Sequence, residues 1–308
     1  MTATATTWQE LRVEIERRLR TGAVEAAGAE ARWLVEQVSG YDGVELVLSE
    51  HELATAPAVA HLDDMVERRL GGEPLQYVLG RWQFLGLDLL VDRRVLVPRP
   101  ETEVVALTAI EEAVRSGARR GSSDPWRASD TTYTVADLGT GSGALALALA
   151  TELPDAEVWA TDVSDDALAV TRANLAGIGT AATRVRVGAG SWFGGLPDEL
   201  RCRLRLIVSN PPYVAEHEVA ELPPTVVEWE PRAALVSGPT GLEAIEAIVA
   251  DAPGWLEPEG GALVLELAPH QAEFALALAR QSGFAHAEVR PDLTGRDRVL
   301  LARMTGPG

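Results

Sequence analysis

The fold of this chain is indicated most directly by Tyr133-Thr134-Val135-Ala136-Asp137-Leu138-Gly139-Thr140-Gly141-Ser142-Gly143. Apolar residues lead into a glycine-rich turn, and the alternating alanines and leucines of 144–150 then favour a helix. Strand, turn and helix in this order allow the backbone to approach a ligand at a helix N-terminus. The glycine spacing is G-x-G-x-G and lacks the extra residue of the dinucleotide fingerprint. The stretch therefore predicts an α/β fold that binds a nucleoside in preference to a pyrophosphate.

A carboxylate follows the next predicted strand. Asp162 ends the segment 158–162 and lies 19 residues past Gly143, where a strand-tip carboxylate can accept hydrogen bonds from both ribose hydroxyls. The alternative is that Asp162 caps a helix beginning near Asp165. Loop and carboxylate together predict a nucleoside cofactor, with the binding residues Gly139, Thr140, Gly141, Ser142, Gly143 and Asp162.

A later strand, predicted at 206–209, ends in an unusual rim. It stops at Asn210, because Pro211 and Pro212 lack the N–H that a sheet ladder needs. The planar amide of Asn210, two prolines of fixed φ and the ring of Tyr213 suit the capture of another planar amide-like group. Taken alone, the tetrapeptide is more simply a strand exit, with Asn as a turn former and Tyr as packing.

Composition limits the class of protein. The 308 residues predict two domains, and a hydrophobic content of 46% supplies a sizeable core. We expect a cytoplasmic protein that does not associate with membranes, since we find no leader and no run of 18 or more apolar residues. The single cysteine, Cys202, excludes an internal disulfide and a cysteine metal cluster. The five histidines lack metal-like spacing, so no metal site is predicted.

The net charge of −19 bears on partners. Proteins that grip duplex DNA neutralise phosphates with basic residues, whereas this chain has no lysine. We expect no stable nucleic-acid binding, and an acidic surface could steer a basic protein partner.

Residues 1–72 are predicted to form an N-terminal helical bundle. Thr7-Trp8-Gln9-Glu10 has capping-box spacing, and Gly22 follows as a helix stop. A second helix is predicted over 24–38, and a third is marked by apolar residues of 62–70 and closed by Gly71-Gly72. The bundle carries no chemical motif. It is either a structural cap or the part that recognises the substrate.

Residues 73–103 are predicted to form a hairpin and linker ahead of a catalytic domain over 104–308. Alternate prolines in Val97-Pro98-Arg99-Pro100-Glu101-Thr102-Glu103 hold the chain extended, and the two glutamates lie near a helix start. The segment is either an ordinary linker or an edge of the active cleft that supplies Arg99 and Glu101. Residues 117–131 are expected to form an exposed loop.

Together, DLGTGSG at 137–143, Asp162 and NPPY at 210–213 resemble the class I S-adenosylmethionine-dependent methyltransferases that act on an amide or exocyclic amine. Further motifs are similar to the HemK/PrmC family: Gly72-Glu73-Pro74, Trp82-Gln83-Phe84, 97–103, Trp192-Phe193, Glu230-Pro231-Arg232 and 292–298. This resemblance implies a Rossmann-like, seven-stranded mixed sheet with one antiparallel strand and a small N-terminal helical domain. It also implies S-adenosylmethionine as cofactor and S-adenosylhomocysteine as product.

The resemblance implies an acceptor as well: the glutamine of the Gly-Gly-Gln loop in peptide chain release factors, methylated on its amide nitrogen. Trp192 would then lie near the adenine, with core packing as the rival interpretation. Ser191 stands where the family commonly has an acidic residue. Arg232 is expected either beside the substrate channel or in a surface ion pair. A monomer is expected.

A mechanism follows from the poor nucleophilicity of an amide, whose lone pair is delocalised. The Asn210 oxygen and the Pro211 carbonyl would accept hydrogen bonds from the substrate NH2, while Tyr213 with Pro212 packs on the flat amide. These four residues are thus the predicted substrate-binding set, Asn210, Pro211 and Tyr213 are the catalytic set, and Asn210 also borders the cofactor. The alternatives are an adenine-N6 nucleic acid methyltransferase and a non-catalytic nucleoside-binding module.

Overall fold

The computed structural model describes residues 6–118 and 132–305, and these fall into two compact units. One unit contains the chain up to Arg81 together with Pro223–Trp229, and the other contains Trp82–Leu222 and the residues from Glu230 onward. The predicted loop 117–131 lies almost wholly outside the described residues. No helix in the described ranges is long and apolar enough to cross a membrane.

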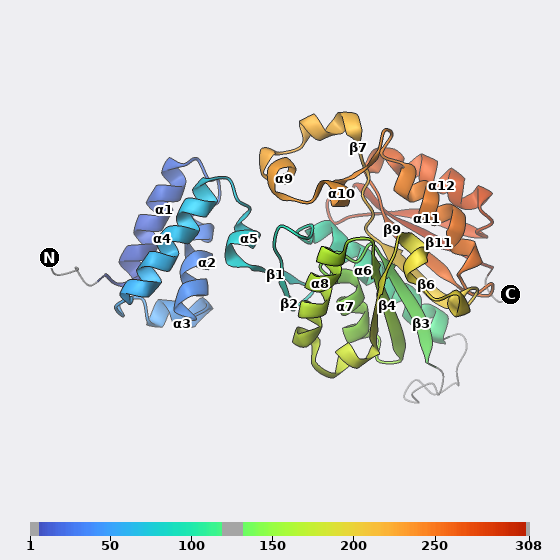
Figure 1. Ribbon diagram of the computed structural model, residues 1–308, viewed down its shortest axis with the longest axis horizontal. Helices are drawn as coiled ribbons and strands as arrows, with labels where there is room; N and C mark the ends of the chain where they lie inside the picture. Colours follow the sequence, from blue (N-terminus) through green and yellow to red (C-terminus); the bar gives the residue numbers. More distant parts are fainter. Residues whose placement is uncertain (1–5, 119–131, 306–308) are drawn as a thin grey trace. The chain divides into compact units, whose positions relative to one another are not determined.

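The first unit is helical, as its sequence pattern predicts (Figure 1). Its helices are α1 (Trp8–Thr21), α2 (Ala27–Ser39), α3 (Gly43–Leu48), α4 (Ala56–Leu70), α5 (Leu75–Leu79) and α9 (Pro224–Trp229). Thr7 and Glu10 form the predicted capping box, and Gly22 and Gly71 end α1 and α4. Apolar faces of α1, α2 and α4 share one buried core around Leu19, Leu34 and Val66. The short helices α3 and α5 escaped prediction because a single turn carries too little periodicity.

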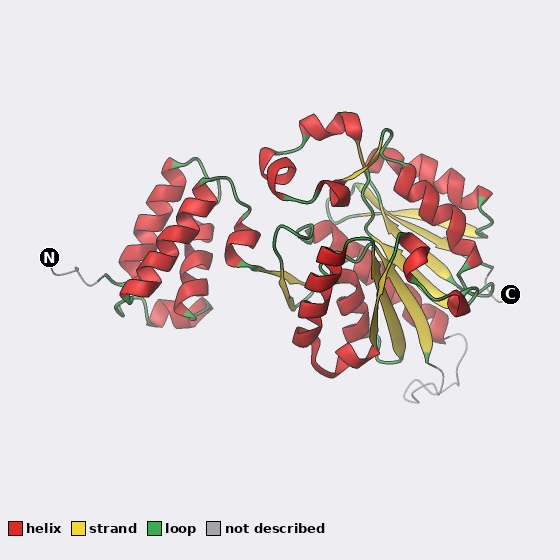
Figure 2. Ribbon diagram, viewed as in Figure 1, coloured by secondary structure: helices red, strands yellow, loops and turns green. Residues whose placement is uncertain are grey.

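The second unit is built on a seven-stranded sheet, which confirms the predicted fold class (Figure 2). Its order is β10-β11-β9-β6-β3-β4-β5, and only β11 runs antiparallel to its two neighbours. The strands are β3 (Tyr133–Leu138), β4 (Ala156–Asp162), β5 (Val185–Ala189), β6 (Leu204–Ser209), β9 (Ala262–Glu266), β10 (His286–Pro291) and β11 (Asp297–Arg303). Two small sheets accompany it: β1 (Arg81–Phe84) with β2 (Leu87–Leu90), and β7 (Val214–Ala215) with β8 (Val236–Gly238).

Helices cover both faces of the large sheet (Figures 1 and 2). Successive strand residues point to opposite faces, so Val135 packs with α6 (Pro100–Ala118) and α7 (Ala144–Glu152), whereas Ala136 packs with α11 (Glu243–Asp251) and α12 (Ala272–Gln281). The other helices are α8 (Asp165–Asn174) and α10 (Arg232–Leu235), with 3-10 helices at Leu175–Arg184, Trp192–Gly195, Asp198–Leu200, Glu216–Glu221, Ala252–Gly254 and Pro269–Gln271.

The strand that carries the tetrapeptide ends as predicted. All six residues of β6 are buried, and the strand stops at Ser209, immediately before Asn210. Cys202, the exposed cysteine, precedes the other end of this strand. The sheet therefore fixes Asn210 at the carboxyl end of a central buried strand.

Candidate active site

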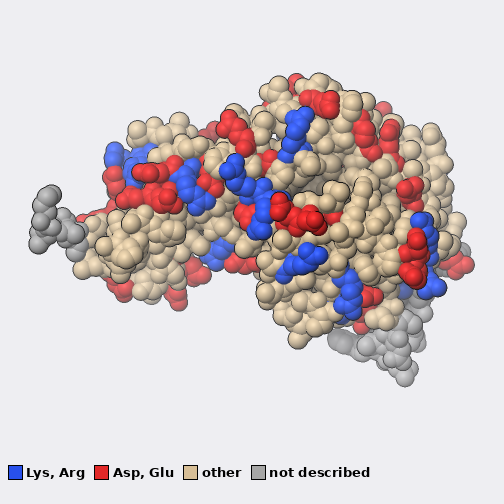
Figure 3. Space-filling view, in the orientation of Figure 1, with Lys and Arg blue, Asp and Glu red and all other residues tan. Residues whose placement is uncertain are grey.

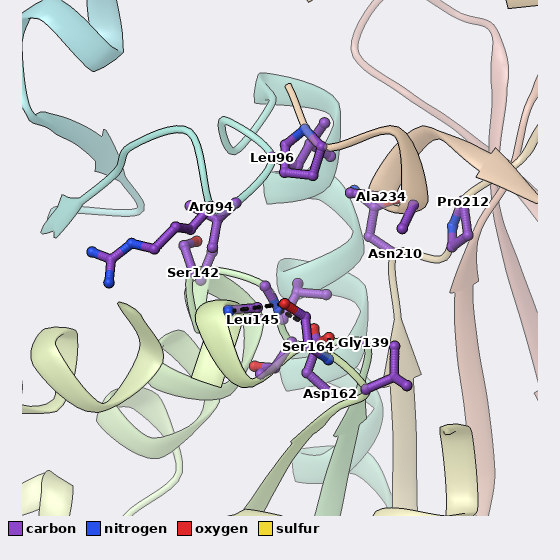
Figure 4. Close-up of a pocket in the computed structure, with 18 of the residues that line it drawn as sticks. Arg94, Leu96, Gly139, Ser142, Leu145, Asp162, Ser164, Asn210, Pro212 and Ala234 are labelled. Atoms are coloured by element: carbon purple, nitrogen blue, oxygen red, sulfur yellow. Dashed lines mark hydrogen bonds between the residues drawn. The ribbon is translucent and has the colours of Figure 1, made fainter. Parts of the chain in front are cut away.

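A cavity of about 220 Å³ opens where several strand ends meet. The central strand β3 has β4 on one side and β6 on the other, and in such sheets ligands bind outside the carboxyl ends of the strands at this point. The lining residues with a predicted role lie at or just after the ends of β3, β4, β5 and β6: Gly139, Thr140, Gly141, Ser142, Asp162, Ser191, Trp192, Asn210 and Pro212. Figure 4 labels Gly139, Ser142, Asp162, Asn210 and Pro212 among them. Apolar walls come from Val95, Leu96, Pro98, Leu145, Ala233 and Ala234.

The glycine loop has two functions. Gly139, Gly141 and Gly143 have φ of 73°, 57° and 87°, in the left-handed region that favours glycine. The first two line the cavity, and open space surrounds the position of a Gly141 side chain. Gly143 is absent from the described lining, and a Cβ there would lie 2.6 Å from Cδ1 of Leu147. Gly143 thus provides the tight turn into α7, while the other two leave room for a ligand.

Asp162 lies at the cavity with its carboxylate held in place. Its Oδ2 accepts from the Gly141 N–H at 2.9 Å, and its Oδ1 accepts from the Ser164 N–H at 2.9 Å. The cap of α8 is Ser164, whose hydroxyl accepts from Ala167, so the reading of Asp162 as the helix cap is wrong. Because each carboxylate oxygen has a second lone pair, both can still accept from a ribose diol.

Trp192 borders both the cavity and the core. Its ring lies 3.5 Å from the position that a Cβ of Gly139 would occupy, and the half-buried side chain also packs against the cluster between the sheet and α11. Its φ of 47° is a left-handed conformation that costs a non-glycine residue about 1–3 kcal/mol. Trp192 therefore packs against the core and also lines the cavity, and its contact with an adenine stays a prediction.

A buried carboxylic acid lies beneath the glycine loop. Asp137 is fully buried; its Oδ2 accepts from the Thr140 hydroxyl at 2.6 Å and from the Ala146 N–H at 3.1 Å. Its Oδ1 has no hydrogen-bond partner among the described residues. Burial raises the pKa of Asp137 to about 7, despite the two hydrogen bonds. No role was predicted for Asp137 from its place in the motif.

The tetrapeptide presents only part of itself to the cavity. Asn210 and Pro212 line it, whereas Pro211 is buried and, like Tyr213, is not among the described lining residues. The Asn210 Nδ2 donates to Thr102 Oγ1 at 3.0 Å. The Tyr213 hydroxyl donates to Glu266 Oε1 at 3.3 Å, and its backbone carbonyl accepts from Gln271. Two of the three predicted catalytic residues, Asn210 and Tyr213, thus have their side chains fixed by hydrogen bonds.

The residues that hold these two side chains, Thr102 and Glu266, were assigned no role from the sequence, and Thr102 also lines the cavity. Thr102 Oγ1 donates to Glu266 Oε2 at 2.7 Å, and Glu266 is 1% exposed. Burial raises the pKa of Glu266 to about 7, opposed by Thr102, Arg298 and Tyr213. One signal was visible in the sequence: a single acid ends the otherwise apolar strand β9.

Two loops beside the cavity are joined by an ion pair. Arg99 donates to Glu230 Oε1 at 2.5 Å, and the neighbouring Pro98 and Pro231 line the cavity. Burial raises the pKa of Glu230, against the attraction of Arg99. Glu101 and Arg232, the other residues proposed near the cleft, are not among its described lining.

The site taken together fits a nucleoside ligand. An open glycine loop, a fixed carboxylate and an indole surround one side of the cavity, and an oriented carboxamide stands on the other. The carboxylate suits a ribose and the indole suits a base, since aromatic side chains stack on bases with about 1–3 kcal/mol each.

Comparisons with known proteins agree with this arrangement. The family model described as the PrmC N-terminal domain matches residues 10–80, and the methyltransferase small domain matches 127–227. A release factor glutamine methyltransferase of Deinococcus radiodurans is 39% identical over 298 residues, which cover 97% of this chain and 99% of that protein. One from Moorella thermoacetica is 40% identical over 291 residues, covering 94% and 95%. The resemblance drawn from the motifs is confirmed.

A solved structure shows the same fold. The catalytic domain of hMettl16, in complex with MAT2A 3'UTR hairpin 1, superposes with a TM-score of 0.53 over 90% of this chain and 94% of that chain. The two sequences are 15% identical, so this likeness concerns the fold alone.

Proposed function

The chain belongs to the release factor glutamine methyltransferase family, and on that premise we propose that it methylates the side-chain amide nitrogen of the Gly-Gly-Gln glutamine in peptide chain release factors. The observation that carries this proposal is the Asn210 carboxamide, which borders the cavity with its Nδ2 tied to Thr102. Its oxygen end is thereby left to accept a hydrogen bond from another amide.

S-adenosylmethionine is the proposed methyl donor. Gly139, Thr140, Gly141 and Ser142 would surround it, Asp162 would accept from its ribose, and Trp192 would stack on its adenine. Gly143 contributes indirectly, by turning the loop into α7. When bound, the donor supplies a methyl group bonded to a positively charged sulfur, and the carbon of that methyl group is electrophilic without a metal.

The chain's own contribution is to hold a weak nucleophile. The Asn210 oxygen and the Pro211 carbonyl would accept the two N–H groups of the substrate amide, and Pro212 with Tyr213 would limit its tilt. Orientation of this kind can lower a barrier by up to about 7–11 kcal/mol. The proton released after transfer would pass to water or to these carbonyls.

The N-terminal bundle over 1–72 is proposed to take part in recognising the release factor, with 104–308 as the catalytic domain. A monomeric, cytoplasmic enzyme without stable nucleic-acid binding completes the proposal. On the face shown in Figure 3, arginine and acidic side chains are interspersed. Nucleic-acid binding rests on basic side chains that neutralise phosphates, so this mixed charge supports a protein acceptor over a nucleic acid.

Replacing the carboxamide tests the proposal. We expect Asn210→Ala to weaken S-adenosylmethionine binding only modestly and to slow methyl transfer to a release factor by orders of magnitude. Mass spectrometry of the loop glutamine and calorimetry with the donor give the two readings. Leu293→Ala, which alters a side chain that is 94% exposed, is the control. Undiminished transfer by Asn210→Ala would contradict the proposed role.

The alternative acceptor is tested in the same assay. Duplex DNA and RNA hairpins containing adenine replace the release factor, and we expect no added methyl. Methylated adenine at rates comparable with the release factor would favour the adenine-N6 reading instead.

A further inference from the structure

Four side chains from α6, β9 and the loop 210–213 form one hydrogen-bonded chain beside the cavity. Asn210 Nδ2 donates to Thr102 Oγ1 at 3.0 Å, Thr102 Oγ1 donates to Glu266 Oε2 at 2.7 Å, and Tyr213 donates to Glu266 Oε1 at 3.3 Å. Thr102 belongs to α6 and Glu266 ends β9. Thr102 is 3% exposed and lines the cavity beside Asn210, whereas Glu266 is 1% exposed and is not among the described lining residues.

The direction of these bonds follows from the chemistry of the groups. An ionised carboxylate only accepts, so Glu266 takes the single hydroxyl proton of Thr102. The Thr102 oxygen is then left as an acceptor, and it can bind only the Nδ2 end of the Asn210 amide. The Oδ1 end must consequently be the one presented away from Thr102.

We propose that Glu266 and Thr102 are positioning residues, which set the orientation of the Asn210 amide so that its oxygen, and not its nitrogen, meets the substrate NH2. The inference rests on the proposed function, because it assigns these residues to the acceptor side of that site. The same carboxylate fixes the Tyr213 ring from its other oxygen.

Protonation of Glu266 would reverse the direction. A protonated carboxyl can donate to Thr102, and the Thr102 hydroxyl can then donate to the Asn210 oxygen. The amide would turn over and present N–H groups to the N–H groups of the substrate, which cannot form a hydrogen bond. Methyl transfer is therefore expected to fall as the pH drops through the pKa of Glu266, which burial raises to about 7.

The charged and titratable groups facing Glu266 act in both directions. Arg298 of β11 and the Tyr213 hydroxyl lower its pKa, as does the hydrogen bond from Thr102, whereas Glu101 of α6 raises it. Tyr213 itself stays protonated, because burial and the adjacent Glu266 raise its pKa.

Substitution of Thr102 separates orientation from packing. Thr102→Val keeps the shape of the side chain and removes the hydroxyl, whereas Thr102→Ser keeps the hydroxyl. We expect Thr102→Val to lower kcat by about 10- to 100-fold with little change in KM for S-adenosylmethionine, and Thr102→Ser to restore most of it. If Thr102 served only for packing, Thr102→Ser would not restore kcat while the KM for S-adenosylmethionine stayed unchanged.

The pH profile is the second reading. Wild-type kcat should decline below pH 7, whereas Thr102→Val and Glu266→Gln should lose this decline. The first variant lacks the hydroxyl that links Glu266 to the Asn210 amide, and the second lacks the group that ionises. Wild-type kcat without an acid limb, or the same limb in all three proteins, would overturn the proposal.

A third reading needs no methyl acceptor. The side-chain amide resonances of Asn210, assigned by their loss in Asn210→Asp, should titrate in wild type and stay constant in Glu266→Gln. If wild type methylates no release factor while this titration is observed, the proposed function fails and the orienting network stands. Normal methylation by Thr102→Val with no amide titration in wild type would refute the network alone.

Discussion

Asp137 is a single residue whose ionisation lowers the stability of the folded chain. Its carboxyl is fully buried at the end of β3, and its pKa is raised from 3.8 to about 7. The folded chain thus holds this proton more tightly than the unfolded chain. Stability from this group is fully present below about pH 4 and is lost as the pH rises through about 7.

Asp137→Asn tests this dependence. The asparagine oxygen can still accept from Thr140 and Ala146, but the group no longer ionises. We expect the free energy of unfolding of the variant, relative to wild type, to improve by on the order of 3–4 kcal/mol between pH 4 and pH 8. Urea unfolding at both pH values measures it, with the exposed Asp198→Asn as control. An equal difference at the two pH values would contradict the assignment.

The glycine loop before α7 makes a prediction at the scale of an element. A Cβ at Gly143 would meet Leu147 at 2.6 Å and Thr171 at 3.2 Å, whereas one at Gly141 would meet nothing within 4 Å. Gly143→Ala should therefore lower the free energy of unfolding by about 2–4 kcal/mol through overpacking and left-handed strain. Gly141→Ala should cost only about 1–2 kcal/mol through strain alone.

Ligand affinity should follow the opposite order. Gly141 lines the cavity, so Gly141→Ala is expected to weaken S-adenosylhomocysteine binding at least tenfold in calorimetry, and each variant controls for the other. Wild-type affinity in Gly141→Ala would mean that the loop does not contact the nucleoside.

The strand, loop and helix signals of this region were predictable because they are local. Proline stops β6 and glycine turns β3 into α7 whatever surrounds them. The contact of Thr102 with Glu266 spans 164 positions, so no local pattern could reveal it. The two-residue strand β7 likewise forms only because β8 pairs with it.

At the scale of the whole molecule, the net charge of −19 favours approach by cationic partners. Peptides with the same Gly-Gly-Gln core but lysine or glutamate flanks test this. We expect kcat/KM to be higher for the lysine peptide at low salt, and the two values to converge above about 0.5 M salt, where the Debye length falls to a few ångströms. Equal values at low salt would exclude steering by the surface charge.

The motifs correctly indicated the family, because they depend on residue type and order. Which residues line the cavity could not be assigned in this way. Gly143 and Tyr213 belong to the motifs, yet the structure places one against Leu147 and the other against Glu266.

The position of Cys202 gives the chain a ready site for a spectroscopic probe. It is exposed in the turn before β6, and Asn210 follows the other end of that six-residue strand, which is itself about 20 Å long. With no other thiol and no lysine, a maleimide dye would attach at one point and leave the cavity unobstructed. Energy transfer from this dye to a labelled acceptor peptide would then report when the peptide arrives, before any methyl group has moved.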